Sequence, residues 1–328
     1  MKILVAYDAK SEWPNVPADL EMTYCNDDRR SIEHAMTPDT EVLVTDVMPT
    51  DISACVGLRW LHLLSAGTDQ LICHPLMKQE LKVSNSAGIC AVHMAEFVVG
   101  QLLRHRKRFD ALAELSWSKV WPDRVAYSRP SLRGQHALII GYGGVGRETA
   151  RLLTAFGMTV TAIQTAVARQ HYSGCMPFEG IGDPDGIIPR NIVTTAELSS
   201  VLPEADVVIL AVPLTPATHH LMNREAFARM KRDAVLINVS RGGVVDTASL
   251  LEALATETFD HAFLDVFEIE PLPADSVLWR HPRITVTPHM SGVMPDAWQQ
   301  QQELFLLNVD HYRNNKTLIN ELDRSRFA

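Results

Sequence analysis

The sequence predicts an α/β fold made of two Rossmann-like domains, each built on a parallel sheet. Short apolar runs alternate with helical segments along most of the chain, which is the pattern of parallel strands joined by helical crossovers. A glycine-rich turn joins a strand to a helix in the second half only, so the two halves are expected to bind different groups. The length of 328 residues suits two domains of ordinary size.

Composition and charge are those of an ordinary globular protein. The net charge of -9 argues against non-specific binding to nucleic acid or to an anionic membrane, because both depend on basic patches. The one basic cluster, residues 104–108, ends a predicted helix, where cations complement the helix dipole. Five cysteines without a C-x-x-C pair indicate reduced thiols in a cytoplasmic protein. No apolar run approaches the roughly 18 residues of a membrane span.

The first domain is predicted to comprise residues 1–100 and 295–328. Its expected strands are Lys2–Tyr7, Glu41–Thr45, Leu58–Leu64 and Leu81–Asn85. The turn Ser65–Asp69, with the sequence SAGTD, directly follows the third strand, and ligands of open α/β sheets bind beyond strand carboxyl ends. Its small residues leave backbone N–H groups accessible to a carboxylate. The alternative is an ordinary turn between a strand and a helix.

Three further segments lie between or after the sheets. Ala91–Phe109 has apolar residues at helical spacing and is predicted to be a long helix that crosses between the domains. Trp117–Gly134 contains two prolines and is predicted to be irregular. Pro295–Tyr312 is predicted to be a helix that packs back on the first domain.

The second domain, residues 101–294, is predicted to hold a dinucleotide. Its expected strands are Ala137–Ile140, Thr159–Ile163, Asn191–Thr194, Asp206–Val212, Ala234–Val239, His261–Val266 and Arg283–Thr287. The segment Thr165–Arg190 carries four glycines and three prolines, which exclude a regular helix. We expect a long surface loop beside the adenosine end of the cofactor.

Gly141, Gly143 and Gly146 form a G-x-G-x-x-G turn after the first of these strands. The first glycine permits a tight turn, the second lets the backbone approach a pyrophosphate, and the third lets the helix pack closely on the strand. The helix that follows points its amides and its positive dipole end at the phosphates. The alternative is a glycine-rich turn that binds nothing, but the strand before it and the helix after it favour the dinucleotide.

Arg241, Glu270 and His289 follow the ends of three successive predicted strands. Reduction of a 2-oxo acid needs a cation for the carboxylate and the carbonyl oxygen, a proton donor, and a partner that tunes the donor. Arginine, histidine and glutamate supply these functions. Each residue alone also suits an ordinary role: an arginine in a surface ion pair, a solvated loop acid, or a histidine hydrogen-bonded at a strand end.

The sequence resembles the D-isomer-specific 2-hydroxyacid dehydrogenase family over nearly its whole length. The stretches that carry the resemblance are SAGTD, NSAG (Asn85–Gly88), GYGGVGR, ADVVILAVPLTPAT, INVSRGGVVD, AFLDVFEIEPLP and TPHMSG. The resemblance implies an active site in the interdomain cleft and a reversible NAD(P)H-dependent reduction of a 2-oxo acid to the D-2-hydroxy acid. It also implies a homodimer formed through the nucleotide domain.

The resemblance further assigns roles to individual residues. His289 is the general acid and base, Glu270 its partner, and Arg241 the clamp on the substrate. Asp265 meets the carboxamide of the nicotinamide. The substrate carboxylate is held at Ser65, Ala66 and Gly67. The remaining expected cofactor contacts are Tyr142, Gly144, Val145, Thr165, Val212, Pro213, Thr218, Val239, Ser240, Ser291 and Gly292.

The choice between the two dinucleotides depends on the end of the second strand of this domain. An acid about twenty residues beyond the glycines normally binds the ribose 2′-hydroxyl and repels a 2′-phosphate. Gln164 occupies that position, and no aspartate or glutamate occurs between Glu148 and Glu179. Because Arg169 can meet a phosphate, we expect NADP(H) to be favoured. The alternative is that Arg169 is solvated and that NAD(H) also works.

The substrate pocket is the least determined part of the prediction. Met48 and Met294, with Met290 and Trp298, are candidates to line it, although methionine more often fills cores. Such a lining favours 2-oxo acids with apolar side chains. The alternative is a glyoxylate/hydroxypyruvate reductase that prefers small substrates.

Other classes of function are weaker alternatives. Formate dehydrogenases, which are related, typically carry glutamine where Glu270 stands, and phosphite oxidation is a further, less favoured reaction. An NAD(H)-responsive interaction scaffold, similar to the corepressors of the family, is the alternative outside enzymes. The histidines show no metal-ligand spacing with cysteines or acids, so we predict no metal site.

Overall fold

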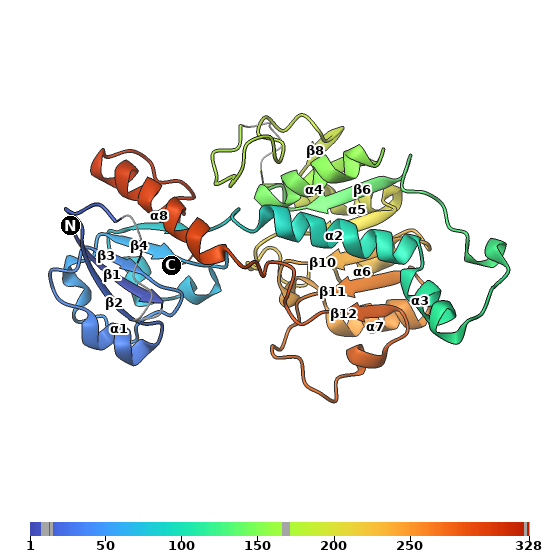
Figure 1. Ribbon diagram of the computed structural model, residues 1–328, viewed down its shortest axis with the longest axis horizontal. Helices are drawn as coiled ribbons and strands as arrows, with labels where there is room; N and C mark the ends of the chain where they lie inside the picture. Colours follow the sequence, from blue (N-terminus) through green and yellow to red (C-terminus); the bar gives the residue numbers. More distant parts are fainter. Residues whose placement is uncertain (8–12, 14–15, 166–170, 325–326, 328) are drawn as a thin grey trace. The chain divides into compact units, whose positions relative to one another are not determined.

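The computed structural model describes residues 1–7, 13, 16–165, 171–324 and 327. The chain divides into two units: one comprises Met1–Ile89, Ser173–Pro177 and Pro295–Ala328, and the other Cys90–Tyr172 and Phe178–Met294 (Figure 1). The expected contact of Arg169 with a 2′-phosphate lies outside the described residues.

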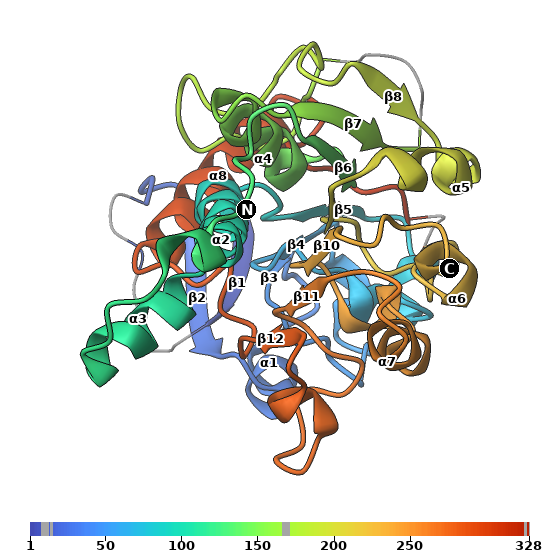
Figure 2. The ribbon, with the colours of Figure 1, turned by 90° about the vertical axis from the view of Figure 1, so that its right-hand side faces the viewer.

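The division between the units falls at residue 89 and not at residue 100, where the sequence analysis put it. The reason is helix α2 (Ala91–Arg106), whose Val98 and Leu102 pack in one core with Leu153 of helix α4 (Gly144–Ala155). Figures 1 and 2 show α2 and α4 side by side. The whole of α2 therefore belongs to the second unit.

The first unit is built on a five-stranded sheet with the order β2-β1-β3-β4-β5, and every pair of neighbours is parallel. The strands are β1 (Lys2–Tyr7), β2 (Glu21–Asn26), β3 (Val42–Val44), β4 (Trp60–Leu63) and β5 (Lys82–Asn85). Four of them confirm predicted strands. Strand β2 was not predicted, because this edge strand is half-exposed and carries no continuous apolar run.

Both faces of this sheet are covered. On one face, α1 (Arg29–Ala35) packs with the short 3-10 turns Cys55–Gly57, Asp69–Leu71 and Pro75–Lys78. On the other face, α8 (Ala297–Arg313) buries Phe305 against the ring of Trp60, with ring centroids 5.0 Å apart. The predicted return of the last helix onto the first domain is confirmed.

The second unit is built on a seven-stranded parallel sheet with the order β12-β11-β10-β9-β6-β7-β8. Figure 2 labels these strands except β9. Its strands are β6 (His136–Ile140), β7 (Thr159–Ile163), β8 (Asn191–Val193), β9 (Val207–Leu210), β10 (Val235–Asn238), β11 (His261–Leu264) and β12 (Ile284–Val286). The order reverses between β6 and β9, and ligands of such sheets bind at this switch point. All seven predicted strands are confirmed.

Helices cover the two faces of this sheet. Helices α2 and α4 lie on one face, and α5 (Leu198–Val201), α6 (Arg224–Phe227) and α7 (Thr247–Ala255) lie on the other. Short 3-10 turns complete the described elements: Arg124–Tyr127, Thr195–Glu197, Leu202–Glu204, Gly242–Val244 and Val277–Arg280.

The predicted helix Ala91–Phe109 is wrong at its carboxyl end. Arg108 adopts a left-handed conformation (φ 53°), which ends α2 and starts a separate helix, α3 (Phe109–Ser118). Helix α3 buries no side chain, and the Trp117 side chain is 82% exposed.

Described residues of the loop predicted over Thr165–Arg190 make contacts within both units. In the first unit, the Cys175 N–H donates to Asn320 Oδ1 at 3.0 Å. In the second unit, Asp183 is only 3% exposed. The loop is thus less of a free surface segment than its glycines and prolines predict.

Candidate active site

A histidine–glutamate pair lies at the carboxyl edge of the second sheet. His289 follows β12 and Glu270 follows β11, so neighbouring parallel strands deliver both side chains to one edge. His289 Nδ1 lies 2.8 Å from Glu270 Oε2. The two side chains are 51% and 36% exposed. Because Nδ1 faces the carboxylate, Nε2 is the ring atom left for proton exchange.

Asp265 fixes the backbone that carries His289. Its carbonyl accepts the His289 N–H at 2.8 Å. Its carboxylate accepts the Thr287 hydroxyl at 2.6 Å, the Met290 N–H at 2.9 Å and the Ser291 N–H at 2.8 Å. These bonds hold His289 in the left-handed region (φ 53°), which residues other than glycine rarely adopt. The Asp265 contact with nicotinamide stays a prediction, and the structure adds this positioning role.

Arg241 and Glu270 come from two turns whose backbones are in direct contact. A Cβ at Gly242 would lie 1.8 Å from the carbonyl carbon of Phe267, so only glycine fits there. The Phe267 N–H donates to Glu270 Oε1 at 2.8 Å, which orients the carboxylate whose other oxygen faces His289. The contact between the two turns therefore fixes the backbone of Arg241 relative to the histidine–glutamate pair.

Asn238, which the sequence analysis did not single out, organises the turn after β10. Its Nδ2 donates to the Arg241 carbonyl at 3.1 Å, and its Oδ1 accepts the Ser240 N–H at 3.0 Å and the Ser240 hydroxyl at 2.8 Å. The Arg241 guanidinium in turn donates to the Ser240 carbonyl at 2.8 Å. Val239 and Ser240 are 3% and 7% exposed. An asparagine that ends an apolar strand is the signal that points to this role.

A second ion pair joins the neighbouring turns. His220 Nε2 lies 2.8 Å from Glu268 Oε1. Burial raises the pKa of the Glu268 carboxyl, but hydrogen bonds from Thr247 and His220 outweigh burial and leave that pKa below its usual value. The turn that carries Glu270 is thus tied to the segment after β9.

The glycine turn has the geometry that a dinucleotide requires. Gly141 has φ 101°, and a Cβ there would lie 2.2 Å from the Ala211 carbonyl oxygen across the switch point. A Cβ at Gly146 would lie 2.1 Å from the Gly141 carbonyl oxygen, so this glycine lets α4 approach the strand. A Cβ at Gly143 would meet no described atom within 4 Å. The second glycine therefore keeps open the space where a pyrophosphate approaches, and the residues present fit the cofactor.

The other expected cofactor residues follow strands of this sheet or begin α4, and their contacts with a cofactor stay predictions. Thr218 shapes the segment after β9, because its hydroxyl donates to the Pro213 carbonyl at 2.7 Å and accepts the Thr215 N–H at 2.8 Å. At the end of β7, the Gln164 N–H donates to the Val193 carbonyl at 3.0 Å. Strand carboxyl ends or the start of α4 also carry Val212, Gly144, Val145, Thr165, Ser291 and Gly292.

The SAGTD turn in the first unit leaves two amides available. The Ser65 N–H donates to Asp46 Oδ1 at 2.7 Å, and the Ala66 carbonyl accepts Asn85 Nδ2 at 2.9 Å. Within the described part of the chain, the N–H groups of Ala66 and Gly67 donate to no protein atom. Burial, partly offset by the bond from Ser65, raises the pKa of the Asp46 carboxyl. Asp46 is a residue that the sequence analysis missed.

A cavity of about 440 Å³ lies beside this turn, within the first unit. Met48 lines it together with Arg29, Asp46, Val47, Pro49, Thr50, Gln70, His74 and Pro75. The role of Met48 in binding substrate stays a prediction. The Trp298 ring stacks on Tyr7, with ring centroids 3.7 Å apart, and packs, partly buried, against the aromatic core of the first unit. Its place in a substrate pocket stays a prediction.

Met294 is 6% exposed and Met290 48% exposed, and both belong to the second unit. Their proximity to a substrate stays a prediction.

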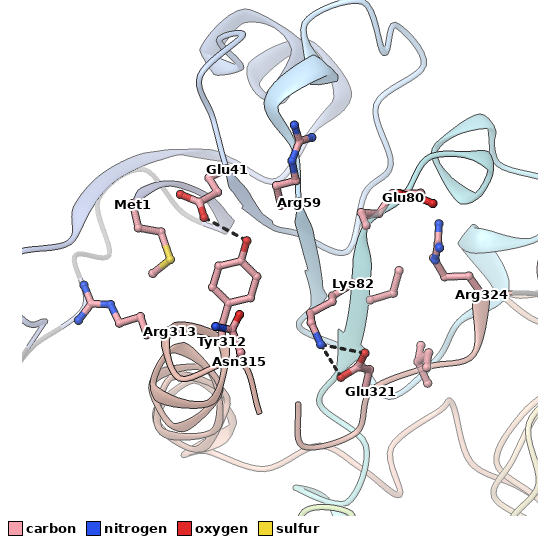
Figure 3. A pocket seen from close by; sticks show the side chains of 13 residues that line it. Met1, Glu41, Arg59, Glu80, Lys82, Tyr312, Arg313, Asn315, Glu321 and Arg324 are labelled. Carbon is pink, nitrogen blue, oxygen red and sulfur yellow. Dashed lines mark hydrogen bonds and ion pairs between the residues drawn. The ribbon is translucent and has the colours of Figure 1, made fainter. Parts of the chain in front are cut away.

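A larger groove of about 780 Å³ lies at the opposite edge of the first sheet, among the amino ends of the strands (Figure 3). Lys82 pairs with Glu321 at 3.2 Å, and the Tyr312 hydroxyl donates to Glu41 at 3.0 Å. Burial, helped by the bond to Glu41, raises the pKa of Tyr312 to about 12. The groove is separate from the carboxyl-end turns that carry the candidate site.

The described residues contain no cluster of three or more histidine, cysteine or acidic side chains arranged to hold a metal ion. None of the helices in the described ranges is long and apolar enough to cross a membrane.

Comparison with known proteins identifies the family. Residues 99–291 match the model of the D-isomer specific 2-hydroxyacid dehydrogenase, NAD binding domain. The chain belongs to the D-isomer specific 2-hydroxyacid dehydrogenase family. It is therefore an NAD(P)-dependent oxidoreductase, as the resemblance in the sequence implied.

Relatives extend the match beyond this domain. A glyoxylate reductase of Thermofilum pendens is 30% identical over 272 residues, which cover 81% of this chain and 76% of that protein. An (S)-sulfolactate dehydrogenase of Chromohalobacter salexigens is 32% identical over 260 residues, covering 78% and 77%. The relatives thus differ in the substrates that their names give.

Solved structures share the fold over the whole chain. A D-isomer specific 2-hydroxyacid dehydrogenase family protein from Aeromonas salmonicida is 26% identical, with a TM-score of 0.77 and coverage of 98% of this chain and 99% of that one. An NADPH-dependent glyoxylate/hydroxypyruvate reductase from Sinorhizobium meliloti, solved with NADP and sulfate, is 22% identical, with a TM-score of 0.80 and coverage of 100% and 99%. The α/β fold with parallel sheets is thus confirmed.

Proposed function

We propose that this protein reduces a 2-oxo acid to the D-2-hydroxy acid, with His289 as the proton donor. The observation that carries the proposal is the pair of His289 and Glu270, 2.8 Å apart at the carboxyl edge of a dinucleotide-binding sheet. The carboxylate fixes the Nδ1 side of the ring and leaves Nε2 for proton exchange. Proton exchange by a positioned histidine typically contributes about 10²–10⁴-fold to a rate.

Arg241 is proposed to hold the substrate. Its guanidinium presents several N–H donors in a plane, which suits the carboxylate and the carbonyl oxygen of a 2-oxo acid. In the oxidative direction, the pair of His289 and Glu270 takes up the hydroxyl proton. When bound, the nicotinamide dinucleotide supplies the hydride that adds to C2.

The amides of Ala66 and Gly67 are proposed to receive the substrate carboxylate. The Ser65 N–H is engaged by Asp46, which leaves the next two amides of the turn for an anion. The carbonyl of Ala66 is fixed by Asn85, so the orientation of the peptide that follows is set before substrate arrives. Ser65 is proposed to contribute as part of the same turn, with its N–H held by Asp46.

NADP(H) is the proposed cofactor. Gln164 ends β7 at the position where an acid would repel a 2′-phosphate. Glu148, in α4, is the last acid before Gln164 in the sequence. It is 1% exposed and pairs with Arg151 at 2.6 Å, so its charge is already balanced. Arg169 is proposed to meet the 2′-phosphate.

The substrate is proposed to carry an apolar group beyond C2. The cavity of about 440 Å³ beside the SAGTD turn is much larger than glyoxylate needs, and Val47, Met48, Pro49 and Pro75 give it apolar walls. This observation favours branched or aromatic 2-oxo acids over glyoxylate. Narrowing the cavity with Val47→Phe is expected to lower kcat/KM for a branched acid about tenfold and to leave glyoxylate reduction nearly unchanged.

The enzyme is further proposed to be a homodimer formed through the second unit. The apolar side chains of α3 and the turn after it are unusually exposed for a monomer surface, with Trp117 82% and Trp121 90% accessible. All five cysteines are free thiols, which suits the proposed cytoplasmic location.

One assay tests the proposal. Purified protein is given NADPH or NADH with glyoxylate, hydroxypyruvate, pyruvate and branched or aromatic 2-oxo acids, and the oxidation of the cofactor is followed. We expect turnover that is fastest with NADPH and an apolar acid. Binding of the dinucleotide without turnover of any acid would overturn the proposal and favour an interaction scaffold.

A further inference from the structure

Asp183 lies 41 positions after Tyr142, the second residue of the G-x-G-x-x-G turn, yet its side chain reaches the turn itself. The carboxylate accepts the Tyr142 hydroxyl at 2.6 Å. It also accepts the N–H of Ile187 at 2.9 Å and the N–H of Ile188 at 3.0 Å. With 3% of its surface exposed, Asp183 is a buried acid that fixes one phenol and is itself fixed by two backbone amides.

Arg147, in the first turns of α4, completes the contact from the other side. Its Nε donates to the Tyr142 carbonyl at 3.1 Å, and its guanidinium also donates to the Asp183 carbonyl. The guanidinium carbon lies 4.8 Å from the centroid of the Tyr142 ring and 5.0 Å from that of Tyr172. Arg147 is 3% exposed, so these contacts are shielded from water and from screening by salt.

A neighbouring residue of α4 holds the same segment. Glu148 Oε2 accepts the Gly182 N–H at 2.6 Å, while its carboxylate is paired with Arg151. The segment Gly182–Ile188 is therefore attached to α4 at two successive positions, 147 and 148. We call this segment the strap.

The position of Tyr142 explains why the strap matters for the turn. From Gly141 to Gly144 the sequence is G-Y-G-G, so Tyr142 is the one residue of the turn that has a side chain. Glycines lose more conformational freedom on ordering than other residues do. Within Gly141–Gly144, side-chain contacts can hold the backbone in one conformation only at this tyrosine, and both its hydroxyl and its carbonyl are engaged.

We propose that Asp183 is a positioning residue for the dinucleotide: through Tyr142 it holds the glycine turn in the conformation that receives the pyrophosphate. Asp183 does not touch the cofactor. The inference rests on the proposed dinucleotide site and not on the choice of 2-oxo acid. A turn that is ordered before binding spares the ligand the cost of ordering it, so loss of the strap contact weakens binding.

Titration of NADPH fluorescence against the purified apo protein tests the proposal. Tyr142→Phe removes only the hydroxyl and leaves both amide bonds of Asp183 in place, so the variant is expected to fold. We expect the Kd for NADPH to rise about tenfold, which is about 1.4 kcal/mol. The same rise is expected for NADH, because both dinucleotides carry the pyrophosphate, so the ratio of the two Kd values stays unchanged.

Two further variants separate positioning from a direct or a structural effect. Asp183→Asn is expected to weaken NADPH binding similarly, and the double variant is expected to be no weaker than either single one, because both act through one hydrogen bond. Tyr127→Phe removes a hydroxyl from the same unit away from the turn and is the matched control, with an unchanged Kd.

Three results would overturn the proposal. Unchanged Kd values in both single variants would show that the turn is ordered without the strap. Additive losses in the double variant would mean that Tyr142 contacts the cofactor independently of Asp183. A change in the ratio of NADPH to NADH affinity would assign the strap to the 2′-phosphate instead. Because every readout is binding, a failure of the proposed 2-oxo acid reduction leaves this test intact.

Discussion

Replacing Gly242 by alanine tests how the active-site turns are held together. The added Cβ would lie 1.8 Å from the Phe267 carbonyl carbon, 2.1 Å from its oxygen and 2.3 Å from the Glu268 nitrogen. Carbon atoms in contact prefer about 3.5–4.0 Å. The two turns must therefore separate by about 1.5 Å, and all three opposing atoms are backbone, so no side chain can rotate away.

This displacement moves Arg241 away from the pair of His289 and Glu270. A misplacement of about 1 Å in a catalytic array costs about 10²-fold in rate. We expect kcat/KM for the preferred 2-oxo acid to fall by about 10²-fold in Gly242→Ala, with a folded protein by circular dichroism. Steady-state assays with NADPH measure it.

Gly100→Ala is the matched control. Gly100 lies within α2, and a Cβ there would meet no described atom within 4 Å. Alanine is favoured over glycine inside helices by about 1 kcal/mol. The control is therefore expected to keep full activity and to melt at the same or a slightly higher temperature. Retention of more than half of the natural kcat/KM in Gly242→Ala would refute the reasoning.

Four further changes test other parts of the account. Glu270→Gln keeps an acceptor for the Phe267 N–H but replaces the carboxylate that faces His289 Nδ1, so kcat for reduction is expected to fall about 10–10²-fold while the Kd for NADPH stays constant. Gln164→Asp is expected to raise the KM for NADPH at least about tenfold and to spare NADH, because the new carboxylate repels the 2′-phosphate. His62→Asn is expected to make the free energy of unfolding less dependent on pH in acid. Burial lowers the pKa of His62 from 6.5 to about 3, so below pH 6.5 the unfolded chain binds a proton that the folded chain does not. In the natural protein this difference costs about 3 kcal/mol of stability by pH 4.5, as denaturant titrations would show. Trp117→Ser is expected to shift the protein from dimer to monomer in sedimentation analysis, and an unchanged dimer would place the interface elsewhere.

The sequence was sufficient for most of the fold because its parallel strands are buried apolar runs. The strands around the glycine turn are the clearest case, since β6 is buried at all five positions. Strand β2 was not predicted because a half-exposed edge strand need not be apolar. The end of α2 was not predicted because Arg108 adopts a left-handed conformation, and no residue typical of helix ends stands there.

The sequence predicted which candidate-site residues follow strand ends. The structure brings Glu270 and His289 together as expected, because adjacent parallel strands deliver them to one edge. Contacts between distant turns were out of reach of the sequence. Asp183 meets Tyr142 across 41 positions. Such pairs depend on the path of a loop, which has no periodic signal.

Trp298 shows what the packing adds to such predictions. Its ring stacks on Tyr7 and lies, partly buried, against the aromatic core of the first unit. Aromatic pairs stabilise a fold beyond the area that they bury. The sequence places this residue on the returning helix, but its neighbours follow only from the packing of that helix.

The central claim is that His289 transfers the proton in the reduction of a 2-oxo acid. The most direct measurement compares kcat of the natural enzyme and of His289→Asn with NADPH and the best 2-oxo acid, together with the Kd for NADPH of both proteins. The account predicts that kcat falls by about 10²–10⁴-fold while the Kd is unchanged. Equal kcat values in the two proteins, or no turnover by the natural enzyme with any 2-oxo acid, would contradict it.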